Sequence, residues 1–121
     1  MGNATENVGS PARRSARRSP AERLDAALLA LAGHKAQIAE RCEQQWASIT
    51  FSGARHQLSL LFLGDEAAAA GEHFIAELPE HEFTIAGHLV ADAAVCEVEH
   101  RTTPRTHLLV RCEVLLLVDA G

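Results

Sequence analysis

Histidines and carboxylates gather in residues 78–100, around an apolar segment. Imidazole and carboxylate groups bind metals and transfer protons in many proteins. Asp92 stands out because it lies among small and apolar neighbours, four residues after His88. On a strand, that spacing is about 13 Å, too far for the two side chains to share a metal. We hypothesise that Asp92 is a general base in a small pocket, with His88, Arg55 or a helix N-terminus as its partner. The structural alternative, which we favour, is an aspartate whose hydrogen bonds are satisfied in the core or at the end of the sheet.

A second group of metal-binding residue types follows a predicted helix. His73 and Glu77 lie one helical turn apart, and His81 comes shortly after them. Such a pair can be half of a metal site, but the same spacing is typical of a solvated helix rim, which we favour. The sequence contains no HExxH, CxxC, P-loop, GxSxG or GxGxxG motif. We therefore expect no cofactor, and whether the protein is an enzyme stays open.

The charge of the chain is divided unevenly. Residues 1–20 carry a net charge of +3 and the remainder −8, which gives −5 over 121 residues. So acidic a body repels phosphate backbones, and we expect no nucleic-acid partner. No apolar run is long enough to span a bilayer, so we expect no membrane partner and a cytoplasmic location. Ten arginines against one lysine, with abundant alanine, favour a GC-rich bacterial genome.

Helical periodicity begins after a polar leader. Residues 1–18 have almost nothing apolar to bury and are predicted to be a disordered basic tail. Ser19 and Glu22 form a capping-box pattern, and apolar residues at helical spacing extend the predicted helix to about Gln45. Gly33 lies within that helix, at a point where the helix kinks or splits.

Strand signals and a second helix follow. Alternating apolar residues predict strands over 46–52 and 57–63, joined by a hairpin turn at 52–55. A helix is predicted from Asp65, as its N-cap, to the residue before Pro79. Its buried stripe is expected to consist of Ala67, Ala70, Gly71, Phe74 and Leu78.

The last part of the chain predicts a β-hairpin with a defined register. With 103–105 as the loop, Glu97 faces Arg111 on one side of the sheet. On the other side the same register pairs Cys96 with Cys112, Val98 with Val110, Ala94 with Val114, Val90 with Val118 and Asp92 with Leu116. We predict that the cysteines, Cys42 among them, are reduced and buried.

The element order α-β-β-α-β-β predicts an α+β two-layer sandwich. We expect a mainly antiparallel four-stranded sheet with both helices on one face, in a single domain over residues 19–121. The order is also a cyclic permutation of β-α-β-β-α-β, so we suspect a permuted ferredoxin-like plait. The order of the strands within the sheet is left open.

Two classes of function are compatible with this architecture. The sheet face without helices is predicted to be apolar away from the hairpin tip, and soluble monomers rarely expose such an area. We therefore predict a homo-oligomer, an assembly or interaction module with closed two-fold pairing. The expected contact residues are Leu89, Ala91, Ala93, Val95, Leu115 and Leu117. The alternative is a small enzyme or ligand-binding domain that uses Asp92, His88 and the hydroxyls of Ser48, Thr50 and Ser59.

Overall fold

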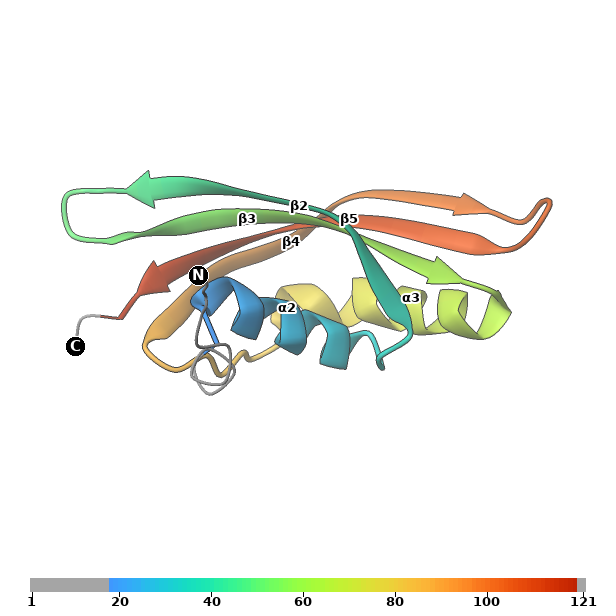
Figure 1. The fold of residues 1–121 in the computed structure, drawn as a ribbon, viewed down its shortest axis with the longest axis horizontal. Helices are drawn as coiled ribbons and strands as arrows, with labels where there is room; N and C mark the ends of the chain where they lie inside the picture. Colours follow the sequence, from blue (N-terminus) through green and yellow to red (C-terminus); the bar gives the residue numbers. More distant parts are fainter. Residues whose placement is uncertain (1–17, 120–121) are drawn as a thin grey trace, which may run out of the picture.

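The protein folds into one twisted sheet with two helices packed on a single face (Figure 1). The structure, a computed structural model, describes residues 18–119. The expected element order and the two-layer α+β sandwich are confirmed. The elements are α2 Pro20–Leu31, β2 Ala36–Ala47, β3 Ser52–Leu63, α3 Asp65–Glu77, the 3₁₀ helix η1 Leu78–Glu80, β4 His88–Arg101 and β5 His107–Val118.

The sheet is antiparallel throughout, in the order β2-β3-β5-β4. β3 and β5 therefore form its centre, and β2 and β4 are its edges. The permuted ferredoxin-like plait stays an interpretation of this topology.

The prediction for residues 1–18 falls almost wholly outside the described part of the chain. Within residues 18–119, no helix is both long and apolar enough to cross a membrane.

The first helix is less than half as long as predicted. It begins as expected: the Glu22 amide donates to Ser19 Oγ at 3.1 Å, and the Ser19 amide donates to Glu22 Oε1 at 2.9 Å. It ends at Leu31, because the chain then reverses through Gly33 and His34, both with positive φ. A glycine adopts that conformation without strain and is a frequent helix terminator. The prediction of helix up to residue 45 is therefore wrong.

The next hairpin is displaced from its predicted position. β2 already starts at Ala36, and the turn lies at Ser48–Phe51, where the Ser48 amide donates to the Phe51 carbonyl at 2.7 Å. The predicted strand over 46–52 and the turn at 52–55 are wrong. Gly53 instead lies within β3, where a Cβ would come within 2.1 Å of the Leu116 carbonyl oxygen. The glycine thus permits the close approach of β5 and does not make the turn.

The second helix matches its prediction closely. α3 covers Asp65–Glu77, but its N-cap is Gly64, not Asp65. Its buried side differs from the predicted stripe in one position, since Ala68 is buried where Ala70 was expected. Gly71 faces the sheet so closely that a Cβ there would lie 2.5 Å from Leu108. The small residues of this helix let it lie directly on β3 and β5.

The C-terminal hairpin follows the predicted register only near its tip. Glu97 pairs with Arg111 and Val98 with Val110, as expected. Two irregularities, between Val95 and Glu97 and between Val90 and Asp92, then shift the pairing by one residue each. A bulge inserts an extra residue into one strand and so moves all later residues to a new partner. The other predicted pairs, those of Cys96, Ala94, Val90 and Asp92, are therefore wrong.

The core lies between the helices and one face of the sheet. Its fully buried side chains come from α2, α3, η1 and the two central strands. The largest of them are Leu24, Leu28, Phe62, Phe74, Leu60, Leu78 and Leu108. The opposite face of the sheet, which we call the open face, carries no helix (Figure 1).

Candidate functional site

The bulges in β4 decide which predicted contact residues reach the open face. Leu89, Leu115 and Leu117 share that face through their pairing. Ala93 and Val95 instead pack against the core under the helices, so their expected place on the open face is wrong. Ala91 lies at the bulge itself.

The apolar area of the open face is also smaller than predicted. Leu115 and Leu117 are only 9% and 6% exposed within the chain itself. Leu89 is about half exposed. The exposed apolar side chains must therefore be sought elsewhere on the molecule.

His88 and Asp92 do not form a common site. Asp92 pairs with Leu115 and lies exposed on the open face, whereas His88 pairs with Val118 on the helix side. Residues four apart share a face in a regular strand, but the extra residue Ala91 reverses the alternation between them. The hypothesis that they act together is therefore wrong. Asp92 is solvated and requires no buried partner.

The three candidate hydroxyl groups are likewise separate. Ser48 and Thr50 belong to the β2–β3 turn, where Ser48 Oγ accepts from the Phe51 amide at 3.1 Å. Ser59 lies far along β3, buried, with its Oγ 3.4 Å from Glu40 Oε1. They form no shared binding surface.

The weak metal candidates lie at the surface around the end of α3. His73, Glu77 and His81 are all exposed, and the His81 ring contacts Phe83 edge-on at 4.6 Å between ring centroids. Within residues 18–119, no three or more histidine, cysteine or acidic side chains are arranged to hold a metal ion.

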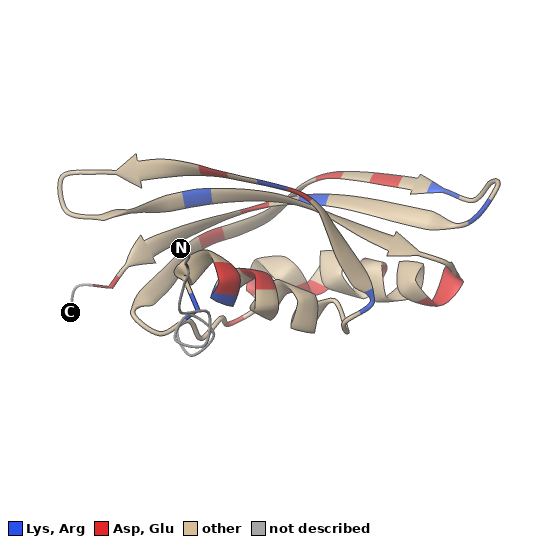
Figure 2. Ribbon diagram, viewed as in Figure 1, with Lys and Arg blue, Asp and Glu red and all other residues tan. Residues whose placement is uncertain are grey.

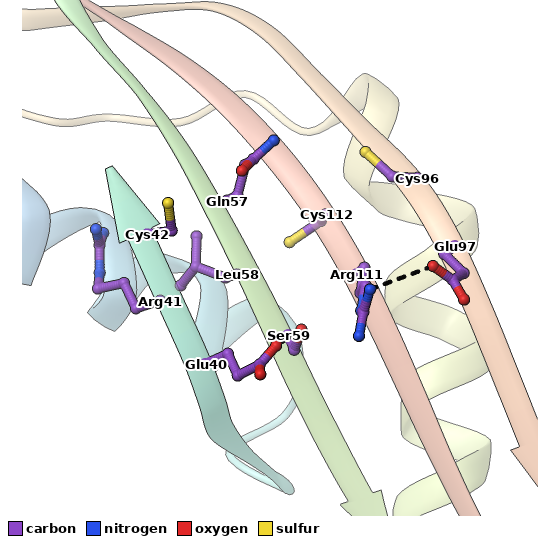
Figure 3. A pocket seen from close by; sticks show the side chains of 10 residues that line it. All are labelled: Glu40, Arg41, Cys42, Gln57, Leu58, Ser59, Cys96, Glu97, Arg111 and Cys112. Atoms are coloured by element: carbon purple, nitrogen blue, oxygen red, sulfur yellow. Dashed lines mark hydrogen bonds and ion pairs between the residues drawn. The ribbon is translucent and has the colours of Figure 1, made fainter. Parts of the chain in front are cut away.

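A hollow of about 700 Å³ crosses the open face (Figure 3). Its walls come from all four strands: Glu40, Arg41, Cys42, Gln57, Leu58, Ser59, Cys96, Glu97, Arg111 and Cys112. Arg111 and Glu97 form an exposed ion pair across it at 3.5 Å. Polar groups that already satisfy each other offer little to a ligand.

Two thiols of this hollow, those of Cys96 and Cys112, have raised pKa values. Burial raises the pKa of Cys112 to about 12. Desolvation, followed by the charges of Glu113 and Asp92, raises the pKa of Cys96. Because the thiolate is the reactive form, both shifts lower the reactivity of these thiols, most strongly for buried Cys112. Cys112 is buried as predicted, but the predicted burial of Cys42 and Cys96 is wrong, since both are exposed.

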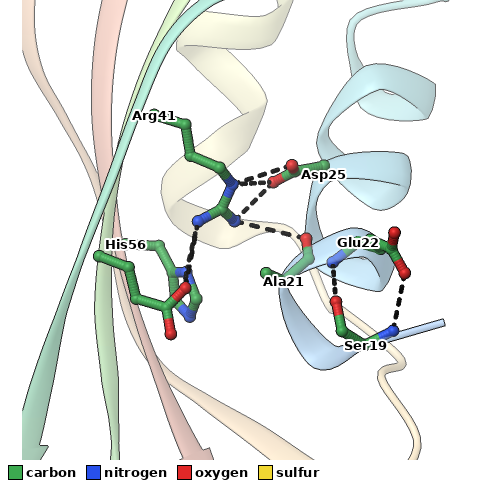
Figure 4. Close-up of polar contacts among 7 residues, drawn as sticks. Ser19, Ala21, Glu22, Asp25, Arg41 and His56 are labelled. Atoms are coloured by element: carbon green, nitrogen blue, oxygen red, sulfur yellow. Dashed lines mark hydrogen bonds and ion pairs between the residues drawn. The ribbon is translucent and has the colours of Figure 1, made fainter. Parts of the chain in front are cut away.

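A polar cluster between α2 and the sheet was missed at the level of sequence (Figure 4). Arg41 of β2 donates to both carboxylate oxygens of Asp25 on α2, from Nε at 3.0 and 2.9 Å and from Nη2 at 2.6 Å. Its Nη1 lies 3.0 Å from Nδ1 of His56 and 3.6 Å from Glu43. The cluster joins the helix to β2 and β3. Residues 36–45 were predicted to be helical, which hid the fact that Arg41 and Glu43 point to the same side of a strand.

His56 is the most buried member of this cluster, with 2% of its surface exposed. Desolvation lowers its pKa, and the positive charge of Arg41 lowers it further. The ring is therefore kept neutral at neutral pH.

A cavity of about 350 Å³ lies beside His56, at the N-terminal end of α2. Its lining includes a second histidine, His88, and the carboxylate-bearing Glu43. The remaining lining residues are Ser19, Pro20, Ala21, Gln45, Ser52, Gly53, Ala54, Leu116 and Val118. The cavity therefore combines an apolar wall with a few polar groups, as small-ligand sites do.

The β2–β3 hairpin extends beyond the helical layer (Figure 1). Apolar side chains lie at its turn. Ile49 at its turn is fully exposed (103%), and Phe51 is about half exposed. Leu89 and Val118, at the ends of β4 and β5 nearest this hairpin, are also about half exposed. We call these four residues the hairpin end; Leu89 lies on the open face of the sheet and Val118 on the helix side. No charged residue interrupts the hairpin between Glu43 and Arg55 (Figure 2).

Comparison with known proteins gives a likeness of fold alone. No protein-family model and no curated protein matches the sequence. The chain is similar in structure to a chain from a solved structure described as "Virion of native gene transfer agent (GTA) particle". The two superpose with a TM-score of 0.57 at 13% sequence identity, over 82% of this chain and 92% of that chain.

Proposed function

We propose that this protein is a structural subunit that associates with copies of itself within a multi-subunit assembly. The observation that carries the proposal is the uncharged arm of the β2–β3 hairpin, which projects from the body. Ile49 is fully exposed at its turn, within the hairpin end. Exposed apolar groups that are gathered in this way mark interaction sites on soluble proteins. The similar fold of a chain in a virion particle supports a role in assembly.

A contact that covers the hairpin end removes its apolar surface from water and so favours association. Complete burial of an exposed isoleucine contributes about 2 kcal/mol, and each half-exposed residue about half as much. Four such residues from each of two subunits supply on the order of 10 kcal/mol, which is comparable to the loss of translational and rotational freedom on association. A two-fold contact would use the hairpin end of both subunits.

The partner that we propose is protein and not nucleic acid or membrane. Within residues 18–119, eight basic residues stand against fifteen acidic ones. An acidic surface repels phosphate backbones and anionic lipid headgroups. An apolar, uncharged arm is free of this repulsion. We propose that the protein is bacterial and that the assembly forms in the cytoplasm.

Sedimentation velocity of the full chain at micromolar concentration tests the proposal. We expect wild-type protein to sediment as a dimer or larger species, and Ile49→Asp to sediment as a monomer with unchanged circular dichroism. Val98→Asp is the matched control, because Val98 is about half exposed but lies near the opposite end of the sheet. Leu117 is unsuited to this test, since it is already buried within the chain. Wild-type protein that stays monomeric at 100 µM, or an Ile49→Asp variant that still associates, would overturn the proposal.

A further inference from the structure

The cavity beside His56 presents two histidines whose proton positions are set by their other contacts. His56 and His88 come from β3 and β4 and both line its wall. Neither histidine belongs to the hairpin end on which the proposed function rests, although Val118 of the hairpin end also lines this cavity. The polar groups that face His56 are Arg41, Glu43, Asp25 and His88.

The proton of His56 lies on the ring nitrogen that Arg41 does not contact. A guanidinium group has only donors, so Nδ1 of His56, 3.0 Å from Arg41 Nη1, must be the acceptor. In a neutral ring the single proton is then on Nε2. Among residues 18–119, Nε2 of His56 has no hydrogen-bond partner. The side chain is 98% buried, but Nε2 is not among the fully buried atoms that lack a partner, so it keeps some contact with solvent. Figure 4 shows this nitrogen on the ring edge that faces away from Arg41.

His88 has the opposite arrangement. Its Nδ1 lies 3.2 Å from the carbonyl oxygen of Ala86, which can only accept, so Nδ1 is the donor. Its Nε2 therefore carries a lone pair when the ring is neutral. Two residues that line the cavity thus carry complementary groups, an N–H donor on His56 and a nitrogen acceptor on His88, and Ala54, Leu116 and Val118 contribute apolar lining.

We propose that this cavity binds a small neutral ligand group that both accepts and donates a hydrogen bond, a primary amide or hydroxyl on a short branched apolar body. The carbonyl or hydroxyl oxygen accepts from His56 Nε2–H, and the N–H or O–H donates to His88 Nε2. A metal is disfavoured because Arg41 keeps the proton of His56 on Nε2, which leaves no lone pair there. A carboxylate is disfavoured because Glu43 lines the cavity and the charge of Arg41 is engaged by Asp25.

Three probes of nearly equal shape separate these possibilities. Isobutyramide donates and accepts, 3-methyl-2-butanone only accepts, and isobutyrate is an anionic acceptor. Each is titrated into ¹⁵N-labelled protein at pH 8, where imidazole rings are neutral. The readout is the amide shift of Ala54 and the ring-nitrogen shifts of both histidines.

We expect isobutyramide to bind about fivefold more tightly than the ketone, the effect of one neutral hydrogen bond, and isobutyrate to bind most weakly. His88→Phe should remove the preference for the amide over the ketone, whereas the control His73→Phe, on exposed α3, should keep it. The same titration on Ile49→Asp identifies the source of the native group: tighter binding there than in wild type points to a side chain of a second copy, and equal binding to a free small molecule. Equal affinity of all three probes, or no cavity shifts up to 50 mM, would overturn the proposal whatever the oligomeric state.

Discussion

Replacement of Arg41 by methionine should reveal how strongly the polar cluster holds α2 to the sheet. The methionine keeps much of the aliphatic volume but removes every donor. Asp25 then loses its bidentate partner, and His56 loses the donor to Nδ1. The contact of Arg41 Nη2 with the Ala21 carbonyl, at 3.3 Å, disappears as well.

The expected magnitude follows from the burial of the pair. The side chains of Arg41 and Asp25 are each 22% exposed, so the pair is intermediate between a fully buried and a fully exposed ion pair. Removal of one partner costs about 3–5 kcal/mol for a buried pair and about 0–1 kcal/mol for an exposed one. With the unpaired acceptor of His56 included, we expect Arg41→Met to lower the free energy of unfolding by roughly 3 kcal/mol.

Urea denaturation of four proteins, namely wild type, Arg41→Met, Asp25→Asn and the double variant, isolates the coupling between the two residues. We expect a coupling energy of about 1.5 kcal/mol. Arg111→Met is the matched control, because Arg111 and Glu97 are each more than half exposed, and it should cost less than about 1 kcal/mol. Histidine titration by NMR should also show the pKa of His56 rising in Arg41→Met, since the charge of Arg41 contributes to its lowering.

The reasoning would be refuted if Arg41→Met cost no more than Arg111→Met, or if the coupling energy were zero within error. Either result would mean that the cluster adds no measurable free energy of unfolding and that apolar contacts alone hold α2 in place.

Three further predictions concern the capping box, the buried histidine and the thiols. Ser19→Ala should lower the free energy of unfolding in urea by about 1 kcal/mol, and no change would show that the hydroxyl contributes nothing to the helix start. Because the pKa of His56 is lowered from 6.5, the unfolded state binds its proton first. This contribution to stability is constant above about pH 6.5 and falls by up to about 1.4 kcal/mol per pH unit below it, until the folded-state pKa is reached. His56→Gln should remove that part of the slope between pH 5 and 8, and an unaltered slope would contradict the assignment. Iodoacetamide should modify exposed Cys42 and Cys96 in the native protein but leave Cys112 intact. Mass spectrometry reads out the modified residues, and rapid modification of Cys112 would contradict its burial.

Most of the architecture could be predicted from local patterns. The capping box at Ser19, the helix that ends before Pro79 and the tip of the last hairpin all depend on residues close together in the chain. Such signals act through short-range hydrogen bonds and side-chain alternation, which the sequence displays directly. The four-strand, two-helix sandwich follows from them.

The main wrong prediction, a helix over residues that form β2, arose because strand pairing outweighed the local pattern. Residues 36–47 contain apolar side chains at spacings that fit a helix, yet they form the edge strand β2. An edge strand with one face open needs few apolar residues, so its alternation is weak. Pairing with β3 over eleven positions, from Ala36 to Ala47, outweighs the local preference. Gly33 was the one local signal that the helix stops early.

The candidate sites depended still more on tertiary structure. The sequence by itself determined the charge of the body and the residues available for chemistry. Only the fold decided that one extra residue in β4 separates His88 from Asp92, and that His88 meets His56 of β3 at the same cavity. A bulge changes the partner of every later residue, and the burial of an imidazole depends on elements far away in the chain. Long-range pairing therefore decides which polar groups meet, and no local pattern carries that information.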